Sequence, residues 1–129
     1  MHLLGVGIDV VDIVRVEQLL ARKGDRALAR LLTERERTYV TSHGNPAPHL
    51  AVRIAAKEAV YKALQTLPAA AAVGWRDLEV LRHVDGRPAI QLHGLADRLA
   101  RRHGPIEIQL SLSHSHSSAA AVAVIVVSR

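Results

Sequence analysis

The longest stretch of helix-forming residues in this chain spans residues 50–67. It contains no Gly or Pro, is rich in Ala and Leu, and follows Pro48, a residue suited to the first turn of a helix. Its larger apolar residues recur at helical spacing and therefore share one face; these are Leu50, Ile54, Tyr61 and Leu64. We predict one long helix here, against which the other elements pack.

Charged residues border the apolar face of this helix on both sides. Glu58 and Lys62 are four residues apart, which places them about 40° from each other around the helix. Arg53 and Lys57 form a second pair with the same spacing at the opposite edge. Because such pairs are common on exposed helices, the spacing alone favours ordinary surface charges over a functional site.

Two other segments place polar residues at the ends of predicted strands. In Gly5-Val6-Gly7-Ile8-Asp9, strand alternation puts Asp9 on the same face as the two glycines. That bare face allows a helix or a ligand to approach the backbone closely. The second segment, residues 110–115, includes His114 near its end. Each segment alone is weak evidence, because a strand-end Asp often caps a helix and a single His is often structural.

Together, these segments resemble the holo-(acyl-carrier-protein) synthases, the small bacterial phosphopantetheinyl transferases. The resemblance rests on the order of four motifs: GxGID near the N-terminus, AVRIAAKEAVYKAL, DGRP, and SLSHSHSSAAAVAVI. It extends over residues 5–127, and its most specific part is the early aspartate combined with the Lys-Glu-x-x-x-Lys of the second motif. It implies the phosphopantetheinyl transferase fold in a trimer-forming chain.

The resemblance also implies a reaction. The enzyme would move the phosphopantetheine arm of coenzyme A onto a serine of apo acyl carrier protein, as in fatty acid biosynthesis, and release adenosine 3',5'-bisphosphate. Asp9 and Glu58 match the family's Mg²⁺ ligands, and a hard cation suits attack on an anionic pyrophosphate. Glu58, or a water that it positions, would take the serine proton. Lys62 would contact the pyrophosphate and protonate the leaving phosphate.

Contacts to coenzyme A and to the carrier protein follow from the same comparison. The positions that match the family's coenzyme A contacts are two basic residues near the phosphates, a turn beside the adenosine and a strand-end histidine, namely Arg53, Lys57, Gly86, Pro88 and His114.

The arginines of the first predicted helix and of the residues just after it would dock the acidic carrier protein. They are Arg15, Arg22 and Arg26. In the family, the active site lies between neighbouring subunits of a homotrimer, with this helix facing the carrier protein. Exposed cations speed the encounter with an acidic partner, although a solvated surface is the plainer interpretation of these arginines.

One departure from the family leaves an alternative open. Relatives usually carry Phe-Gly-Thr-Gly after the lysine of the long helix, and the backbone of that turn approaches the ligand. Here the sequence reads Leu64-Gln65-Thr66-Leu67-Pro68, without glycine. The chain is therefore either an active enzyme with altered backbone contacts or a family-like subunit that trimerises without activity.

A second alternative comes from the net charge of +5, which favours an anionic partner. A small basic nucleic-acid-binding domain fits that charge. However, such domains often stack bases on aromatic side chains, and aromatic residues make up 2% of this chain. We therefore expect no nucleic-acid partner.

The remaining pattern predicts a single α+β domain over residues 1–129, with an antiparallel sheet packed on one long helix. A strand at 3–8 is followed by a helix from Asp12 to about Lys23, ended by Gly24, and by a short helix from the capping-box pattern Thr33-x-x-Glu36 to near Ser42. Strands at 75–84 and 88–92 form a hairpin, a helix spans 95–102, and strands at 106–114 and 119–127 close the chain.

Composition bears on the setting of the protein. Hydrophobic residues make up 49% of the chain, which is sufficient for a modest core, and the absence of cysteine excludes disulfides and thiolate chemistry. No signal-peptide pattern opens the chain, and the longest apolar run, at residues 119–127, is too short to span a bilayer. We therefore expect a cytoplasmic protein without a membrane partner.

Overall fold

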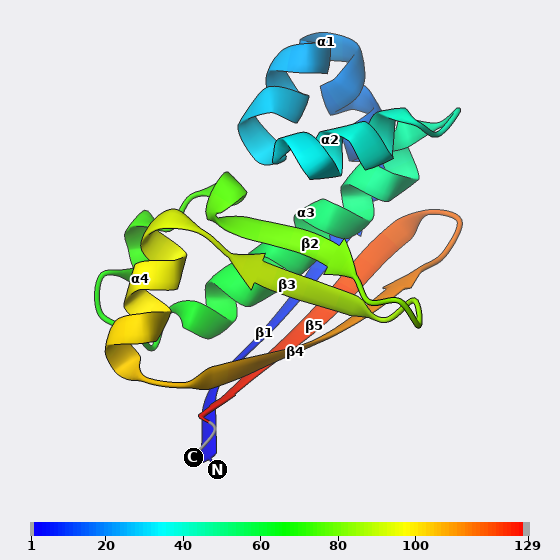
Figure 1. Ribbon diagram of the computed structural model, residues 1–129. Coiled ribbons are helices and arrows are strands. Elements are labelled where there is room, and N and C mark those ends of the chain that lie inside the picture. The colour runs from blue at the N-terminus through cyan, green and yellow to red at the C-terminus, as the bar shows by residue number, and fades with distance from the viewer. Residues whose placement is uncertain (1, 128–129) are drawn as a thin grey trace.

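The computed structural model describes residues 2–127, and one helix, α3 (Pro46–Leu64), passes through its centre. Figure 1 shows α3 running between a three-stranded sheet and a β-hairpin, with α1 and α2 near one of its ends and α4 near the other. The predicted α+β class, with an antiparallel sheet against one long helix, is confirmed.

Helix α3 is displaced toward the N-terminus relative to the prediction. It begins at Pro46 because Asn45 caps it, accepting a hydrogen bond from the Ala47 amide at 3.4 Å, and it ends at Leu64, before the predicted residue 67. The predicted single apolar face is also too narrow. Ile54 and Tyr61 are only partly buried, whereas small residues on the other faces are fully buried, including Ala51, Ala55, Ala56, Ala59 and Ala63. A helix apolar on several faces is one enclosed by other elements, as α3 is here.

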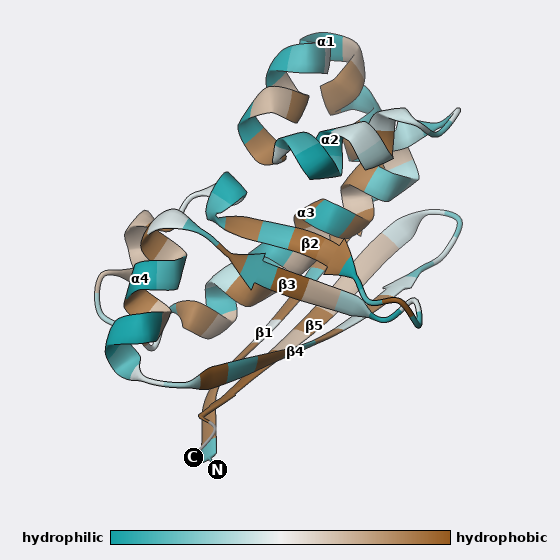
Figure 2. Ribbon diagram, viewed as in Figure 1, coloured by the Kyte–Doolittle hydropathy of each residue, from teal (hydrophilic) through white to brown (hydrophobic). Residues whose placement is uncertain are grey.

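The three-stranded sheet is antiparallel, with the order β1-β5-β4. Its strands are β1 (His2–Asp12), β5 (Ser118–Val127) and β4 (Ile106–His114), so the first strand is longer than predicted and the last two agree closely. Along β4 the predicted alternation is confirmed, because the residues that pack against the core are Ile106, Ile108, Leu110 and Leu112. Figure 2 shows the apolar character of β1 and β5 along much of their length.

Two glycines in β1 set the distance between the sheet and α3. A Cβ atom added at Gly5 would lie 1.9 Å from the carbonyl oxygen of Ala63, and one at Gly7 would lie 1.8 Å from that of Ala59. No side chain fits at such distances, so the strand and helix backbones are in direct contact. The inference that a helix approaches this bare face is confirmed, and it places Asp9 beside the second half of α3.

The hairpin comprises β2 (Leu78–Arg82) and β3 (Pro88–Leu92). The predicted strand at 75–84 starts later because a 3₁₀ turn, η2 (Trp75–Asp77), occupies its beginning, stabilised by a hydrogen bond from the Gly74 amide to Asp77 at 3.0 Å. The predicted turn is confirmed, and Gly86 adopts a φ of 90° within it. A second 3₁₀ turn, η1 (Ala70–Ala72), precedes η2.

The other helices agree with the prediction in position and differ in detail. Helix α1 (Ile13–Leu31) does not end at Gly24 but kinks there, where φ is 45° and ψ is −120°. Helix α2 (Glu34–Thr41) has the predicted capping box between Thr33 and Glu36, and α4 (Gly94–His103) ends at Gly104 as predicted. Within residues 2–127, no helix has the length and apolarity needed to cross a bilayer.

Candidate active site

Asp9, Glu58 and Lys62 form a polar cluster where β1 contacts α3. The Lys62 ammonium donates a hydrogen bond to the Ile8 carbonyl oxygen at 2.9 Å and lies 3.2 Å from Asp9 Oδ1. Glu58 is one helical turn before Lys62 and is partly buried. The close contact at the two glycines brings Asp9 to this helix, so the three predicted residues are gathered at one place.

The electrostatics of this cluster are unusual for a Glu–Lys helix pair. Burial raises the pKa of Glu58, the negative charge of Asp9 raises it further, and Lys62 only partly offsets both effects. Two carboxylates facing one ammonium leave negative charge in excess, which is the condition in which a bound cation is stabilised. Over the described residues, no three or more potential metal-ligating side chains form a cluster, so a cation held here needs further ligands from substrate or water.

A hollow of about 310 Å³ opens beside Glu58. Its walls are mostly apolar and come from α3, the segment before η2, and β2; the lining residues are Lys57, Glu58, Tyr61, Val73, Gly74, Trp75 and Leu78. This volume is at the lower end of the range of small-molecule sites.

The glycine-free turn after α3 is held together by side chains. The Gln65 amide donates hydrogen bonds to the carbonyl oxygens of Tyr61 and Ala70 at 2.9 and 3.2 Å, and the Tyr61 hydroxyl donates to Ala71 at 2.9 Å. Ala69 adopts a φ of 70°, a conformation normally left to glycine. These hydrogen bonds therefore hold the turn although it contains no glycine.

A second pocket, of about 400 Å³, lies on another side of α3. It brings together four of the five predicted coenzyme A contacts, Arg53, Gly86, Pro88 and His114, which come from α3, the hairpin and β4. Its lining also includes residues that were not among the predicted coenzyme A contacts, namely Pro48, His49, Val52, Arg82 and Leu112. None of these lining residues carries a carboxylate, and two are arginines, so the pocket is cationic.

Arg53 is the most informative residue of this pocket. Its side chain is buried, its Nη1 donates to the His49 carbonyl oxygen at 3.1 Å, and the guanidinium lies 4.3 Å from the centroid of the Tyr39 ring. Within residues 2–127 its Nε has no hydrogen-bond partner, and burial lowers the pKa of the Arg53 guanidinium. A buried cation without an anionic contact is costly, and a bound anion would satisfy it.

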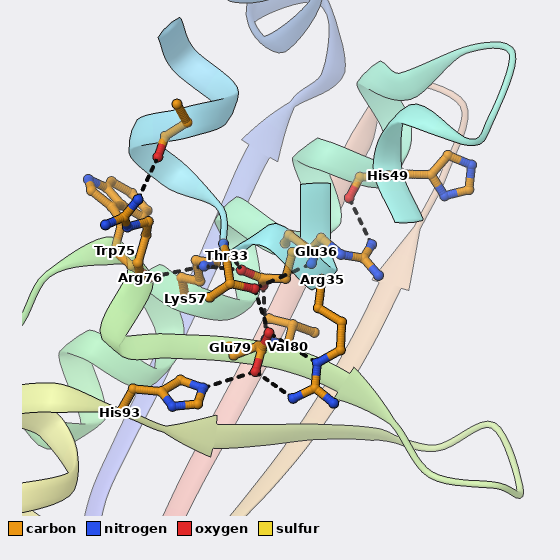
Figure 3. A network of polar contacts seen from close by, with 12 residues as sticks. Thr33, Arg35, Glu36, His49, Lys57, Trp75, Arg76, Glu79, Val80 and His93 are labelled. Carbon is orange, nitrogen blue, oxygen red and sulfur yellow. Dashed lines mark hydrogen bonds and ion pairs between the residues drawn. The ribbon is translucent and has the colours of Figure 1, made fainter. Parts of the chain in front are cut away.

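Lys57 does not line this pocket, and the interpretation of Arg53 and Lys57 as ordinary surface charges is wrong, because both side chains are buried. The Lys57 ammonium is turned inward, 2.7 Å from Glu36 Oε1 and 2.9 Å from the Trp75 carbonyl oxygen (Figure 3). Glu36 also accepts hydrogen bonds from the backbone amides of Thr33 and Val80, both at 2.9 Å. Lys57 thus links α3 to α2 and β2.

A neighbouring network fixes the hairpin to α2. Glu79 accepts hydrogen bonds from Thr33 at 2.5 Å, from Arg35 at 2.9 Å and from His93 at 2.9 Å (Figure 3). Burial raises the pKa of Glu79, but these hydrogen bonds outweigh it and lower the value to about 2. The sequence showed only the capping box that Thr33 and Glu36 share, and nothing in the spacing indicated their contacts with Lys57 and Glu79.

The predicted docking arginines Arg15, Arg22 and Arg26 are all exposed. The first two are seven residues apart in α1 and share a face, whereas Arg26 follows the kink at Gly24. Among the described residues, Arg22 hydrogen-bonds only to the Gln18 carbonyl oxygen, at 3.4 Å, so its guanidinium remains available.

The chain matches the model of the 4'-phosphopantetheinyl transferase superfamily over residues 5–124, and it belongs to this superfamily. Within it, the similar curated proteins are holo-[acyl-carrier-protein] synthases. That of Koribacter versatilis is 42% identical over 79% of this chain and 81% of its own length. That of Moorella thermoacetica is 44% identical over 82% of this chain and 80% of its own.

The chain is also similar to solved structures of holo-[acyl-carrier-protein] synthases. The ACPS–CoA complex of Chronobacterium ammoniagenes is 31% identical, with a TM-score of 0.82 over 100% of both chains. The holo-(acyl-carrier-protein) synthase of Bacillus anthracis, in complex with CoA (3',5'-ADP), is 29% identical, with a TM-score of 0.79 over 98% of each chain. The predicted family and fold are thereby confirmed.

Proposed function

We propose that this protein is a Mg²⁺-dependent holo-[acyl-carrier-protein] synthase. It transfers the phosphopantetheine arm of coenzyme A to a serine of apo acyl carrier protein, and adenosine 3',5'-bisphosphate is the second product. The transfer follows from the family and its coenzyme A complexes. The observation that carries the chemistry is the Asp9–Glu58–Lys62 cluster, with two carboxylates and one ammonium on adjoining backbones.

Asp9 and Glu58 are the residues that would hold the Mg²⁺ ion. Burial raises the pKa of Glu58 and the negative charge of Asp9 raises it further, which supports this assignment because a cation placed there would remove the repulsion between the two carboxylates. Mg²⁺ is usually held by one or two carboxylates together with substrate phosphates and water. When bound, the ion would neutralise charge on the pyrophosphate.

Within the cluster, Glu58 is proposed to accept a proton and Lys62 to assist the leaving phosphate. The serine oxygen forms a bond to the phosphorus that bears pantetheine, and the bond from that phosphorus to the bridging oxygen breaks. Glu58 takes the serine proton directly or through a water. The Lys62 ammonium has three N–H donors and two partners among the described residues, so one N–H is left for the leaving phosphate.

The cationic pocket is the proposed site of the nucleotide, with Arg53, His114 and the turn at Gly86 and Pro88 as contacts. It shares no lining residue with the hollow beside Glu58. Arg53 and Glu58 are five residues apart on α3 and therefore point about 140° away from each other. This separation supports an active site completed by a neighbouring subunit, with Glu58 from one and the cationic pocket from the other.

An exposed apolar strip on β1 supports the homotrimer. Val6, Ile8 and Val10 alternate along the outer face of the strand and are 55%, 60% and 62% exposed. Solvent-exposed strands rarely keep three such residues in a row without a partner surface. Acyl carrier protein would then dock on Arg15, Arg22 and Arg26 beside the site. The cytoplasmic location of the protein stays a prediction.

The decisive experiment incubates the protein with coenzyme A and an apo acyl carrier protein and follows the carrier by intact-protein mass spectrometry. We expect a mass gain of one phosphopantetheine group, its loss with a chelator and its return with Mg²⁺. A folded trimer that produces no mass gain at any metal concentration would identify an inactive subunit and overturn the proposal.

A further inference from the structure

His49 lines the cationic pocket and is not among the predicted coenzyme A contacts. It lies in the first half of α3, and its ring stacks on that of His43 with centroids 3.8 Å apart and an angle of 31° between the planes. Tyr39 contacts both rings, at centroid distances of 4.7 Å to His43 and 5.8 Å to His49. In the part of the chain that the structure describes, neither ring nitrogen of His49 hydrogen-bonds to a protein group, so both remain available to a ligand.

The orientation of this stack is set by His43. Its Nδ1 lies 2.7 Å from the Tyr39 carbonyl oxygen, and because a carbonyl only accepts, this nitrogen carries a proton. His43 is thereby anchored to the end of α2 and holds the His49 ring against one wall of the pocket.

The charged groups that face His49 are all basic or cationic. They are His43 after α2, Arg53 on α3, Arg82 on β2 and His114 at the end of β4. The buried acidic side chain of α2, Glu36, is already bonded to Lys57. Burial, followed by these charges, lowers the pKa of His49, so the ring is neutral at neutral pH when the pocket is empty.

A phosphate group in the pocket would favour the protonated form of the His49 ring over the neutral form. Its negative charge would neutralise the surrounding cations and accept a hydrogen bond from a protonated imidazole, which stabilises the charged ring. We propose that His49 binds a phosphate of the nucleotide in its protonated form, so that nucleotide binding is coupled to the uptake of one proton. This inference rests on the proposed function, in which coenzyme A occupies the pocket.

The direction of the pH dependence follows from linkage. If the pKa of His49 is low in the free protein and raised in the complex, the complex binds one additional proton. The affinity for the nucleotide then rises as the pH falls through the pKa of His49 in the complex. For one proton, the change is at most about tenfold per pH unit. The phosphate monoester itself takes up a proton near a pKa of about 6, so the effect is measurable above that pH.

The test measures binding of adenosine 3',5'-bisphosphate to the metal-free, assembled protein by calorimetry at about pH 7. Titrations in Mops and in Tris, which differ in ionisation enthalpy, give the number of protons taken up. We expect several tenths of a proton for the unaltered protein and close to none for His49→Phe, which retains an aromatic ring against His43. His103→Gln, an exposed histidine at the end of α4, should take up as much as the unaltered protein.

A histidine NMR titration identifies the group that takes up the proton. The His49 ring signals should titrate at higher pH in the complex than in the free protein. Uptake that persists in His49→Phe, or a His49 titration unchanged by the nucleotide, would overturn the proposal. Nucleotide that binds normally without proton uptake refutes only this coupling, whereas no binding at any pH counts against the proposed function itself.

The same titration with 3'-dephospho-coenzyme A and with coenzyme A tells which phosphate is bound. Proton uptake with coenzyme A alone assigns the 3'-phosphate to the pocket. Equal uptake with both assigns the pyrophosphate, and no uptake with either refutes the coupling.

Discussion

At Glu58, burial and the nearby charge of Asp9 both oppose ionisation of the carboxyl group, although cation binding and proton acceptance require the ionised form. A pKa raised above its unfolded value means that the fold favours the protonated acid. This contribution to stability is present at low pH and is lost as pH rises through the folded pKa. At neutral pH the metal-free protein therefore carries an unfavourable charge at its proposed active site.

Replacing Glu58 by Gln should separate the contribution of the carboxylate to catalysis from its cost to stability. We expect kcat to fall at least about a hundredfold, because a proton acceptor and a metal ligand are removed. In chelator-treated protein at neutral pH, we expect the melting temperature to rise slightly, because the unfavourable charge is gone. Mg²⁺ should reduce the difference in melting temperature between the variant and the unaltered protein, because it stabilises only the unaltered protein.

A matched control for this prediction is Glu17→Gln, a neutralised carboxylate on the exposed face of α1. Its melting temperature should respond little, with or without metal. A Glu58→Gln protein that is less stable than the unaltered chain without metal would show that the carboxylate contributes to the fold, and the electrostatic argument would be wrong.

The sequence predicted the acidic pair at residue level, but not the surroundings of the two cations on the same helix. Strand alternation and helical spacing placed Asp9 and Glu58 on their faces, because both patterns depend on local geometry, but only the resemblance to the family implied that the two residues act as a pair. Arg53 and Lys57 have the same i, i+4 spacing, yet one is aimed at a pocket and the other at Glu36. That difference is set by α2 and the hairpin, which are distant in sequence, so no local pattern contains it.

At the scale of elements, Glu36 joins α2, α3 and β2 at a single buried carboxylate. It is 2% exposed and accepts from the Lys57 ammonium and from the Thr33 and Val80 amides. Removing one partner of a buried ion pair leaves the other charge unpaired, which typically costs about 3–5 kcal/mol.

We therefore expect Glu36→Ala to lower the free energy of unfolding in urea by about 3–5 kcal/mol. The double variant Glu36→Gln/Lys57→Met, which buries no charge, should recover a substantial part of that loss. If the double variant folds and keeps a normal KM for coenzyme A, Lys57 is not a phosphate ligand. A large rise in that KM would restore Lys57 to the predicted set of contacts.

Helix α1 is the element proposed to meet the carrier protein. Reversing Arg15 and Arg22 to Glu should raise the KM for carrier protein about tenfold or more and weaken its salt dependence, because attraction between opposite charges is replaced by repulsion. The KM for coenzyme A should stay nearly unchanged. Steady-state kinetics at two ionic strengths measure all three quantities.

Arg98→Glu/Arg102→Glu on α4 changes the net charge by the same amount on two exposed residues and serves as the control. Its effect on the carrier-protein KM should be much smaller. Equal effects of the two double variants would mean that overall charge, and not the α1 surface, governs the encounter.

The boundaries of elements could be predicted where a side chain sets them locally. The capping box of Thr33 and Glu36 placed the start of α2, and Gly104 the end of α4. Gly24 was predicted to end α1, yet the helix resumes because Ala27, Leu28 and Leu31 are buried beyond the kink. Tertiary packing decided this case, as it did for the alanine-rich faces of α3.

At the scale of the whole molecule, the acidic cluster and the cationic pocket lie on different sides of α3, and the proposed reaction needs both. Glu58→Ala and His114→Ala should each be strongly impaired alone. After the two variants are dissociated and reassembled together, some interfaces would pair an intact Glu58 with an intact His114. We expect activity of the mixture to return in part, as measured by carrier-protein mass gain.

Mixing without prior dissociation is the negative control, and native mass spectrometry verifies that mixed assemblies form. If verified mixed assemblies remain inactive, both residues belong to the site of one chain, and the shared site would be wrong. His114→Ala must first show a large defect, since a mild one would hide any recovery.

The contact between Gly5 and Gly7 of β1 and the backbone of α3 has an evolutionary consequence. A saturation library selected only for correctly folded protein should lose nearly every substitution at these two positions, because even a methyl group meets a carbonyl oxygen. Asp9, two residues further on, should accept many replacements in that selection and few in one for activity. The motif at residues 5–9 is thus under two independent selective pressures, folding at the glycines and activity at Asp9. Sequencing the variants that survive each selection would distinguish the two.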